Sequence, residues 1–242
     1  MGDNRKMVSF VPALCALACR KQRRRTVMQI SDNILREQLK NVYFLGGGGY
    51  GGKTTMSQLI AKKYGFRLYH QDDCYDAHAK IATPEFQPSM CLDRNKDWHG
   101  FFAQPPAQYA QWLWGTTMED EQFALMDLIH MARDGKVIAD VNMMTATLRR
   151  ISDPSRVVLL FAPEEMTRNH YFNRSDKEGL KQFILSFPDG EDLLKNVIEA
   201  LHYRADETRK SYYDSGFCCI ERTGHDTIEG TLQKIERHFG WI

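Results

Sequence analysis

The stretch that decides the fold runs from Val42 to Thr55 and reads Val-Tyr-Phe-Leu-Gly-Gly-Gly-Gly-Tyr-Gly-Gly-Lys-Thr-Thr. An apolar run breaks into glycines and then into a lysine and two threonines, which matches Gly-x-x-x-x-Gly-Lys-Ser/Thr in one register. Glycines let backbone N–H groups wrap a phosphate chain, because a Cβ on the inner wall would hold the backbone away from the oxygens. The stretch therefore predicts a phosphate-binding loop.

The loop is expected to bind ATP together with Mg²⁺. Lys53 would reach the β- and γ-phosphates, and the Thr54 hydroxyl would join the shell of the metal. The helix that starts here points its positive end at the anion. The residues expected to contact the nucleotide are Gly47, Gly48, Gly49, Tyr50, Gly51, Gly52, Lys53, Thr54 and Thr55.

The flanking sequence favours this interpretation over a glycine-rich hairpin or linker followed by an unrelated lysine. Residues 41–45 read as a buried strand, and apolar residues recur at helical spacing from Met56 to Tyr64 before a stop at Gly65. Strand, loop and helix are thus in the order that the motif requires.

Four further strands alternate with helices along the chain. We expect these strands at 66–71, 137–140, 156–162 and 217–222, and helices at 31–39, about 119–133, 193–212 and 227–239. The alternation predicts an α/β fold: a three-layer, doubly wound, mainly parallel sheet of five strands. The second strand is expected beside the first.

Acidic residues follow two of these strands, at the edge of the sheet where ligands bind. Asp72 and Asp73 follow the second strand, and one of them would accept a proton from a substrate hydroxyl or hold the metal's water. The alternative is that either residue caps the following turn. Asp140, after the third strand, is a candidate for holding Mg²⁺ through water, with a turn or helix-cap role as its alternative.

Two connections are long enough to cover such a site. Residues 77–130 are rich in aromatic side chains and are expected to form an insertion that covers the active site and selects the substrate, although most of these rings should pack this segment onto the sheet. Residues 165–180 are expected to form a lid. Arg168 and Arg174 in the lid would neutralise charge on the transferred phosphoryl group, or else belong to an ordinary solvated helix end.

Composition sets broad limits on the protein. The 242 residues carry 32 Lys and Arg against 31 Asp and Glu, so the formal charge of +1 predicts no specific nucleic-acid partner. The six cysteines show no Cys-x-x-Cys pair and no Cys/His set with zinc-ligand spacing, which favours free thiols in a reducing cytoplasm. No apolar run approaches the length that crosses a bilayer. The oligomeric state is not predicted.

Residues 1–27 differ from the rest, since they hold seven Lys or Arg and one acid. We expect a flexible basic arm ahead of a kinase domain at 28–242, or translation from an upstream start with Met28 as the working one. A peripheral membrane anchor, in which the apolar run touches lipid and the arginines meet anionic head groups, is the alternative.

The pair of motifs around Lys53 and Asp72 resembles small-molecule kinases of the phosphate-loop class, most closely the uridine kinase and nicotinamide riboside kinase family. Gly-Gly-Lys-Thr-Thr is followed, after the second strand, by Gln71-Asp-Asp-Cys-Tyr, similar to the family's Gln-Asp-Asp-aromatic-aromatic. The resemblance implies that Asp72 is the catalytic carboxylate. It covers residues 41–80 by motif; Cys74 and Tyr50 depart from the family pattern.

The sequence thus predicts transfer of the γ-phosphoryl group of ATP to a hydroxyl of a small molecule, with a nucleoside or related riboside as first hypothesis. Catalytic roles are assigned to Lys53, Asp72, Arg168 and Arg174, and metal binding to Thr54 and Asp140. An antibiotic, a shikimate-like acid or a sugar acid is an alternative acceptor. A nucleotide-binding regulatory protein is the alternative class, although the chain lacks an Asn-Lys-x-Asp signature and an Asp-x-x-Gly after the third strand.

Overall fold

The computed structural model describes residues 29–91, 97–163, 166, 172 and 177–242. Residues 32–242 form one compact unit, separate from residues 1–31. The lid residues Arg168 and Arg174 lie outside the described residues, as does the whole of the expected basic arm, residues 1–27.

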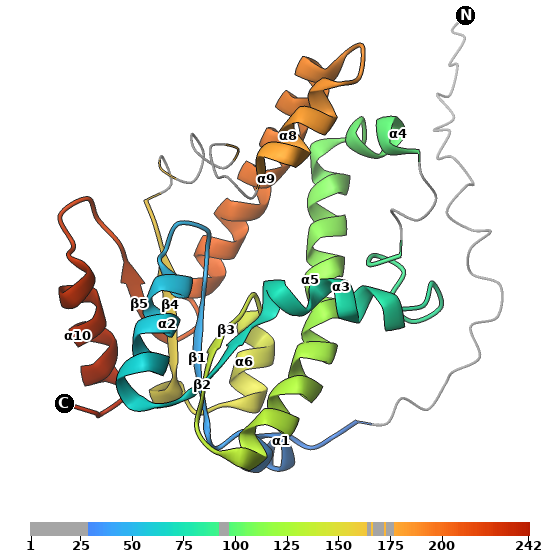
Figure 1. The fold of residues 1–242 in the computed structure, drawn as a ribbon. Helices are drawn as coiled ribbons and strands as arrows, with labels where there is room; N and C mark the ends of the chain where they lie inside the picture. Colours follow the sequence, from blue (N-terminus) through green and yellow to red (C-terminus); the bar gives the residue numbers. More distant parts are fainter. Residues whose placement is uncertain (1–28, 92–96, 164–165, 167–171, 173–176) are drawn as a thin grey trace, which may run out of the picture. The chain divides into compact units, whose positions relative to one another are not determined.

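Five strands form one sheet in the order β2-β3-β1-β4-β5, and every neighbouring pair is parallel (Figure 1). The strands are β1 (Val42–Gly47), β2 (Arg67–His70), β3 (Val137–Asp140), β4 (Val157–Phe161) and β5 (Cys218–Glu221). The fold class predicted from the sequence is confirmed. One detail was wrong: β2 does not pair with β1, because β3 lies between them.

Helices connect the strands and cover both faces of the sheet (Figure 1). They are α1 (Asp32–Gln38), α2 (Lys53–Tyr64), α3 (Gln71–Ile81), α4 (Trp98–Phe102), α5 (Pro106–Met131), α6 (Thr145–Ile151), α8 (Glu178–Leu185), α9 (Gly190–Tyr213) and α10 (Ile228–His238), with 3₁₀ turns η3 (Ala132–Asp134) and η4 (Pro154–Arg156). None of the helices in the described part of the chain is long and apolar enough to cross a membrane.

The strands carry apolar side chains on both faces, as a parallel sheet between two helical layers requires. Phe44 of β1 joins a cluster with residues of α1, α5 and α6, whereas its neighbour Leu45 joins a cluster with residues of α2 and α10. In β4, Leu159 and Leu160 divide in the same way. The period-two alternation therefore places one core on each side of the sheet.

The aromatic segment after α3 differs from expectation in its secondary structure. A helix was expected from about residue 119, but α5 begins at Pro106, which suits the first turn of a helix because proline there forgoes no hydrogen bond. Most aromatic rings of this segment pack against α8 and α9, as Phe101, Phe102 and Tyr109 do. A packing role was expected for most of these rings, but with the sheet as their partner; the cluster that holds them contains, among the described residues, none from a strand.

Candidate active site

The glycine loop joins the end of β1 to the start of α2 and has the close backbone approach that the motif predicts. A Cβ added to Gly47 would lie 1.9 Å from the Leu160 carbonyl oxygen, and one added to Gly51 would lie 2.3 Å from the same atom. Gly47 also has a φ of 126° and Gly52 a φ of 85°. At Gly47 and Gly51 only glycine fits without displacing β4, whereas at Gly52 it is the positive φ that favours glycine.

Tyr50 is the residue in this loop for which sequence and geometry conflict. It has a φ of 60°, the left-handed conformation that non-glycine residues seldom adopt. Strain of this kind persists where the surroundings impose it and is concentrated at functional sites.

Lys53, at the first position of α2, reaches back over the loop, and its Nζ donates to the carbonyls of Gly47 and Gly48 at 3.2 Å each.

The predicted metal ligands meet across two elements. The Thr54 hydroxyl of α2 donates to the Asp140 carboxylate at the end of β3, with 2.7 Å between Oγ1 and Oδ2. His70, opposite Asp140 in the β2–β3 register, places Nδ1 3.3 Å from the same carboxylate oxygen. A hydroxyl and a carboxylate side by side provide the oxygen donors that Mg²⁺ prefers. These residues therefore fit a magnesium ion.

Asp72 and Asp73 point to different places, although they are adjacent in the first turn of α3. Asp72 lines a cavity of about 900 Å³ together with the glycine loop, Thr54 and Asp140. Asp73 instead lines a smaller hollow near Tyr69. Because successive helical residues are about 100° apart, the exact start of α3 decides which carboxylate faces the loop.

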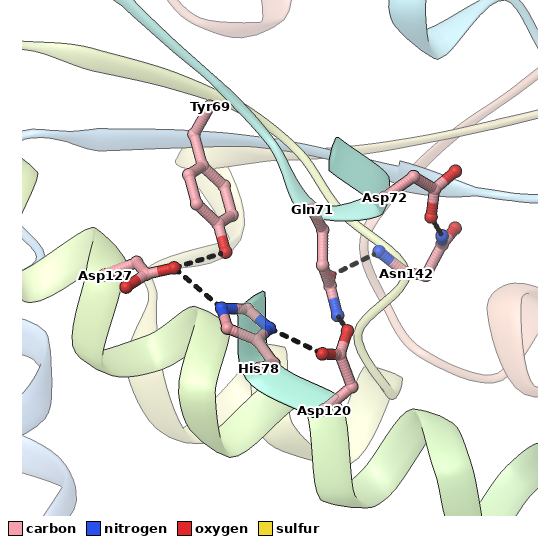
Figure 2. A network of polar contacts seen from close by, with 7 residues as sticks. All are labelled: Tyr69, Gln71, Asp72, His78, Asp120, Asp127 and Asn142. Atoms are coloured by element: carbon pink, nitrogen blue, oxygen red, sulfur yellow. Dashed lines mark hydrogen bonds and ion pairs between the residues drawn. The ribbon is translucent and has the colours of Figure 1, made fainter. Parts of the chain in front are cut away.

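Asp72 is held by a residue that sequence reasoning did not single out. Asn142, two residues beyond β3, donates from Nδ2 to Asp72 Oδ1 over 2.7 Å (Figure 2). The Asn142 backbone N–H donates in turn to the side-chain oxygen of buried Gln71, at 2.9 Å. The position of Asn142 shortly after a strand that ends in an acid was the only sequence signal for its role.

A chain of polar contacts, buried at Asp120 and part-buried at Asp127, continues from Gln71 into α5 (Figure 2). Gln71 Nε2 donates to Asp120 Oδ2 at 2.6 Å, and the other oxygen of Asp120 lies 2.6 Å from His78 Nδ1. His78 Nε2 is 2.9 Å from Asp127, which also accepts from the Tyr69 hydroxyl. The contacts tie α3 to α5 directly behind the carboxylate of Asp72.

Burial and hydrogen bonding shift the pKa values of His78 and Glu121, which lie near these contacts. Burial disfavours the charged form of His78, but hydrogen bonds to Asp120 and Asp127 outweigh it and raise the pKa of the imidazole. For Glu121, by contrast, burial itself raises the pKa, although the carboxylate accepts from the Thr147 hydroxyl and from the Met144 N–H. Asp120 and Glu121 are adjacent in α5 but have different hydrogen-bond partners.

Helices α5 and α9 supply the wall of the cavity away from the loop. Trp114 is the ring of the aromatic segment that lines it, and Thr117 accepts at its hydroxyl oxygen from Arg204 Nη2 over 2.8 Å. His202 also lines the cavity, and its Nε2 is buried with no hydrogen-bond partner among the described residues. Lys177, the described end of the expected lid, reaches the same cavity.

Comparison with known proteins gives little beyond this geometry. No protein-family model matches the chain, and no curated protein matches it. Among solved structures, the shikimate kinase from Acinetobacter baumannii in complex with shikimate is similar, with 15% sequence identity and a TM-score of 0.44 over 85% of this chain and 95% of that one.

Proposed function

We propose that this protein is an ATP-dependent kinase that transfers the γ-phosphoryl group to a hydroxyl of a small molecule. The observation that supports the proposal most strongly is that Asp72, held by Asn142, lines the same cavity as the glycine loop and the Thr54–Asp140 pair. Phosphoryl transfer needs a nucleotide-binding loop, metal ligands and a base, and one cavity brings candidates for all three together.

The loop residues Gly47 to Thr55 would hold the triphosphate through backbone N–H groups, with Lys53 between the β- and γ-phosphates. Thr54 and Asp140 would hold Mg²⁺, which neutralises phosphate charge when bound. Lys53 Nζ already lies over the loop, within 3.2 Å of two of its carbonyls.

Asp72 would orient the acceptor hydroxyl and take its proton as the oxygen attacks the γ-phosphorus. A bond forms between that oxygen and phosphorus, the bond from phosphorus to the β–γ bridging oxygen breaks, and ADP leaves with the electron pair. The Nδ2 donor of Asn142 occupies one carboxylate oxygen, which leaves the other to face the acceptor. Arg168 and Arg174 complete the proposal as cations that stabilise the transition state.

The wall formed by α5 and α9 carries side chains that would select the acceptor. Trp114 offers a ring on which a nucleoside base can stack, which keeps a riboside as a candidate. Four basic side chains outside the glycine loop and α2 line the same cavity and favour the second candidate, a carboxylated polyol such as a shikimate-like or sugar acid; they are Lys177, His202, Arg204 and Arg209. Arginine suits carboxylate recognition because its planar fork can donate two parallel hydrogen bonds.

ADP production tests the proposal, measured with Mg²⁺-ATP against a panel of ribosides, sugar acids and shikimate-like acids. One acceptor class should raise turnover above the rate with water alone. Lys53→Ala should abolish turnover with weakened nucleotide binding, and Asp72→Ala should abolish it with nucleotide binding intact. Asp73→Ala is the matched control, since this neighbouring carboxylate does not line the cavity, and it should retain turnover.

Nucleotide binding without any acceptor-dependent ADP production would reject the kinase and favour a regulatory nucleotide-binding protein. Equal loss of turnover in Asp73→Ala and Asp72→Ala would reject the assignment of Asp72 as the base.

A further inference from the structure

A second cluster of reactive side chains lies behind the active-site wall, between α3 and α5. Cys74 and His78 are four residues apart on α3 and therefore share one helix face, and Asp127 comes from α5. One ligand atom from each of the three residues lies within 4.8 Å of the other two. The sequence pattern shows no familiar zinc spacing, because the third member is supplied by a distant helix.

The imidazole of His78 is already oriented as a metal ligand would be. Its Nδ1 lies 2.6 Å from Asp120 Oδ1, while Nε2 faces Asp127 Oδ2 at 2.9 Å. The ring is buried and stacks on Phe123, with 5.2 Å between centroids and 17° between planes. Zinc-bound histidines almost always donate their other ring N–H to a carboxylate or carbonyl, and Asp120 occupies that position here.

A cation can reach the cluster from solvent. Cys74 and Asp127 line a hollow of about 400 Å³ together with Tyr69 and His130. The Asp127 side chain is 43% exposed, although that of His78 is only 5% exposed. The hollow is separate from the cavity that holds the glycine loop, since Cys74 and Asp127 do not line that cavity. It also leaves room for a water as fourth ligand, as in three-ligand zinc sites.

The donor set selects the kind of metal. A thiolate, an imidazole and a carboxylate suit Zn²⁺ or Co²⁺, whereas Mg²⁺ prefers oxygen ligands of the kind found at Thr54 and Asp140. The thiolate of Cys74 and the carboxylate of Asp127 together balance the charge of a divalent cation. We propose that Cys74, His78 and Asp127 bind one Zn²⁺-class ion, with Asp120 as the partner that orients His78.

Such an ion would clamp α3 to α5. The first turn of α3 carries Asp72, and Asp120 contacts both His78 and Gln71. Metal binding would therefore stiffen the wall from which the carboxylate of Asp72 projects. The proposal does not depend on the kinase assignment, because the three ligands Cys74, His78 and Asp127 do not line the nucleotide cavity, and its test requires no turnover.

The test uses the full chain, freed of metal with a chelator and titrated with Co²⁺ in the presence of excess Mg²⁺. We expect a sulfur-to-cobalt charge-transfer band that saturates at one equivalent and disappears on addition of Zn²⁺. Zn²⁺ should also raise the melting temperature, because it binds the folded state selectively. Excess Mg²⁺ should not displace the Co²⁺.

Variants distinguish this site from adventitious binding. Cys74→Ser should remove the charge-transfer band, whereas the matched control Cys218→Ser, a half-buried free thiol in β5, should retain it. Asp120→Asn should weaken Zn²⁺ binding by about 10- to 100-fold, the usual effect of losing the partner of a ligating histidine. Asp127→Asn alters a partly exposed carboxylate, so it tests the ligand set even where Cys74→Ser fails to fold.

The proposal is overturned if wild type shows no charge-transfer band. It is also overturned if the folded Cys74→Ser or Asp127→Asn protein binds Zn²⁺ with the affinity of wild type.

Discussion

The three variants Gly47→Ala, Gly51→Ala and Gly48→Ala place the same methyl group at three positions of one loop, and the structure predicts a different cost for each. At Gly47 the new Cβ would lie 1.9 Å from the Leu160 oxygen, on a residue with a φ of 126°. Left-handed strain of about 1–3 kcal/mol adds to a packing cost of about 1–3 kcal/mol. Gly47→Ala should therefore destabilise the fold by about 2–6 kcal/mol.

Gly51→Ala and Gly48→Ala separate the packing cost from the backbone strain. Gly51→Ala would place its Cβ 2.3 Å from the same oxygen without a left-handed φ, so only the packing cost applies, about 1–3 kcal/mol. A Cβ on Gly48 would meet the Cβ of Phe161 at 3.6 Å, an ordinary contact. Gly48→Ala should change the free energy of unfolding by less than about 1 kcal/mol.

Urea unfolding at equilibrium, followed by circular dichroism, measures all three changes if the slopes with denaturant agree. The expected order of destabilisation is Gly47→Ala, then Gly51→Ala, then Gly48→Ala. The reasoning is refuted if Gly47→Ala costs no more than Gly48→Ala, because the close approach of the loop to β4 would then be absent.

Three further predictions concern the wall behind Asp72. Asn142→Ala removes a hydrogen bond to that carboxylate, worth about 1.5–3 kcal/mol for a charged group, so kcat should fall about 10- to 100-fold with nucleotide affinity unchanged; a change confined to KM would contradict a positioning role. Gln71→Leu leaves Asp120 Oδ2 and the Asn142 N–H without their hydrogen-bond partner, and urea unfolding should show the free energy of unfolding fall by about 2–5 kcal/mol. The pKa of Glu121 is raised in the fold, so the stability from its bound proton is complete below the unfolded pKa and is lost as pH rises through the folded pKa. Melting temperatures across this range should decline for wild type and stay flatter for Glu121→Gln; parallel curves would exclude the titration of Glu121.

Local features were predictable where a motif or a short-range pattern determines the backbone. The strand at 137–140 and the helix from Lys53 to Tyr64 have their expected places, because apolar period and glycine position act over a few residues. Thr54 and Asp140 were both assigned to one metal site from the sequence, since parallel strands bring their carboxyl ends to one edge of the sheet, and their side chains lie in contact. The lid arginines stay a prediction.

Side-chain direction and long-range pairing were not predictable in the same way. The choice of Asp72 over Asp73 depends on the residue at which α3 begins, because one residue turns a helix by about 100°. The role of Asn142 depends on β3 lying between β1 and β2, which the order of elements along the chain does not state. The partner of Cys74 and His78 comes from α5, and only packing brings it within reach.

The sequence by itself determined that the chain forms a phosphate loop between a buried strand and a helix, because glycine, lysine and threonine at that spacing satisfy a local backbone requirement. Only the tertiary structure decided which carboxylate shares a cavity with the loop, and what holds it. Those outcomes arise from contacts between residues up to 71 positions apart, such as Gln71 with Asn142, and from helix rotation that local propensity does not specify.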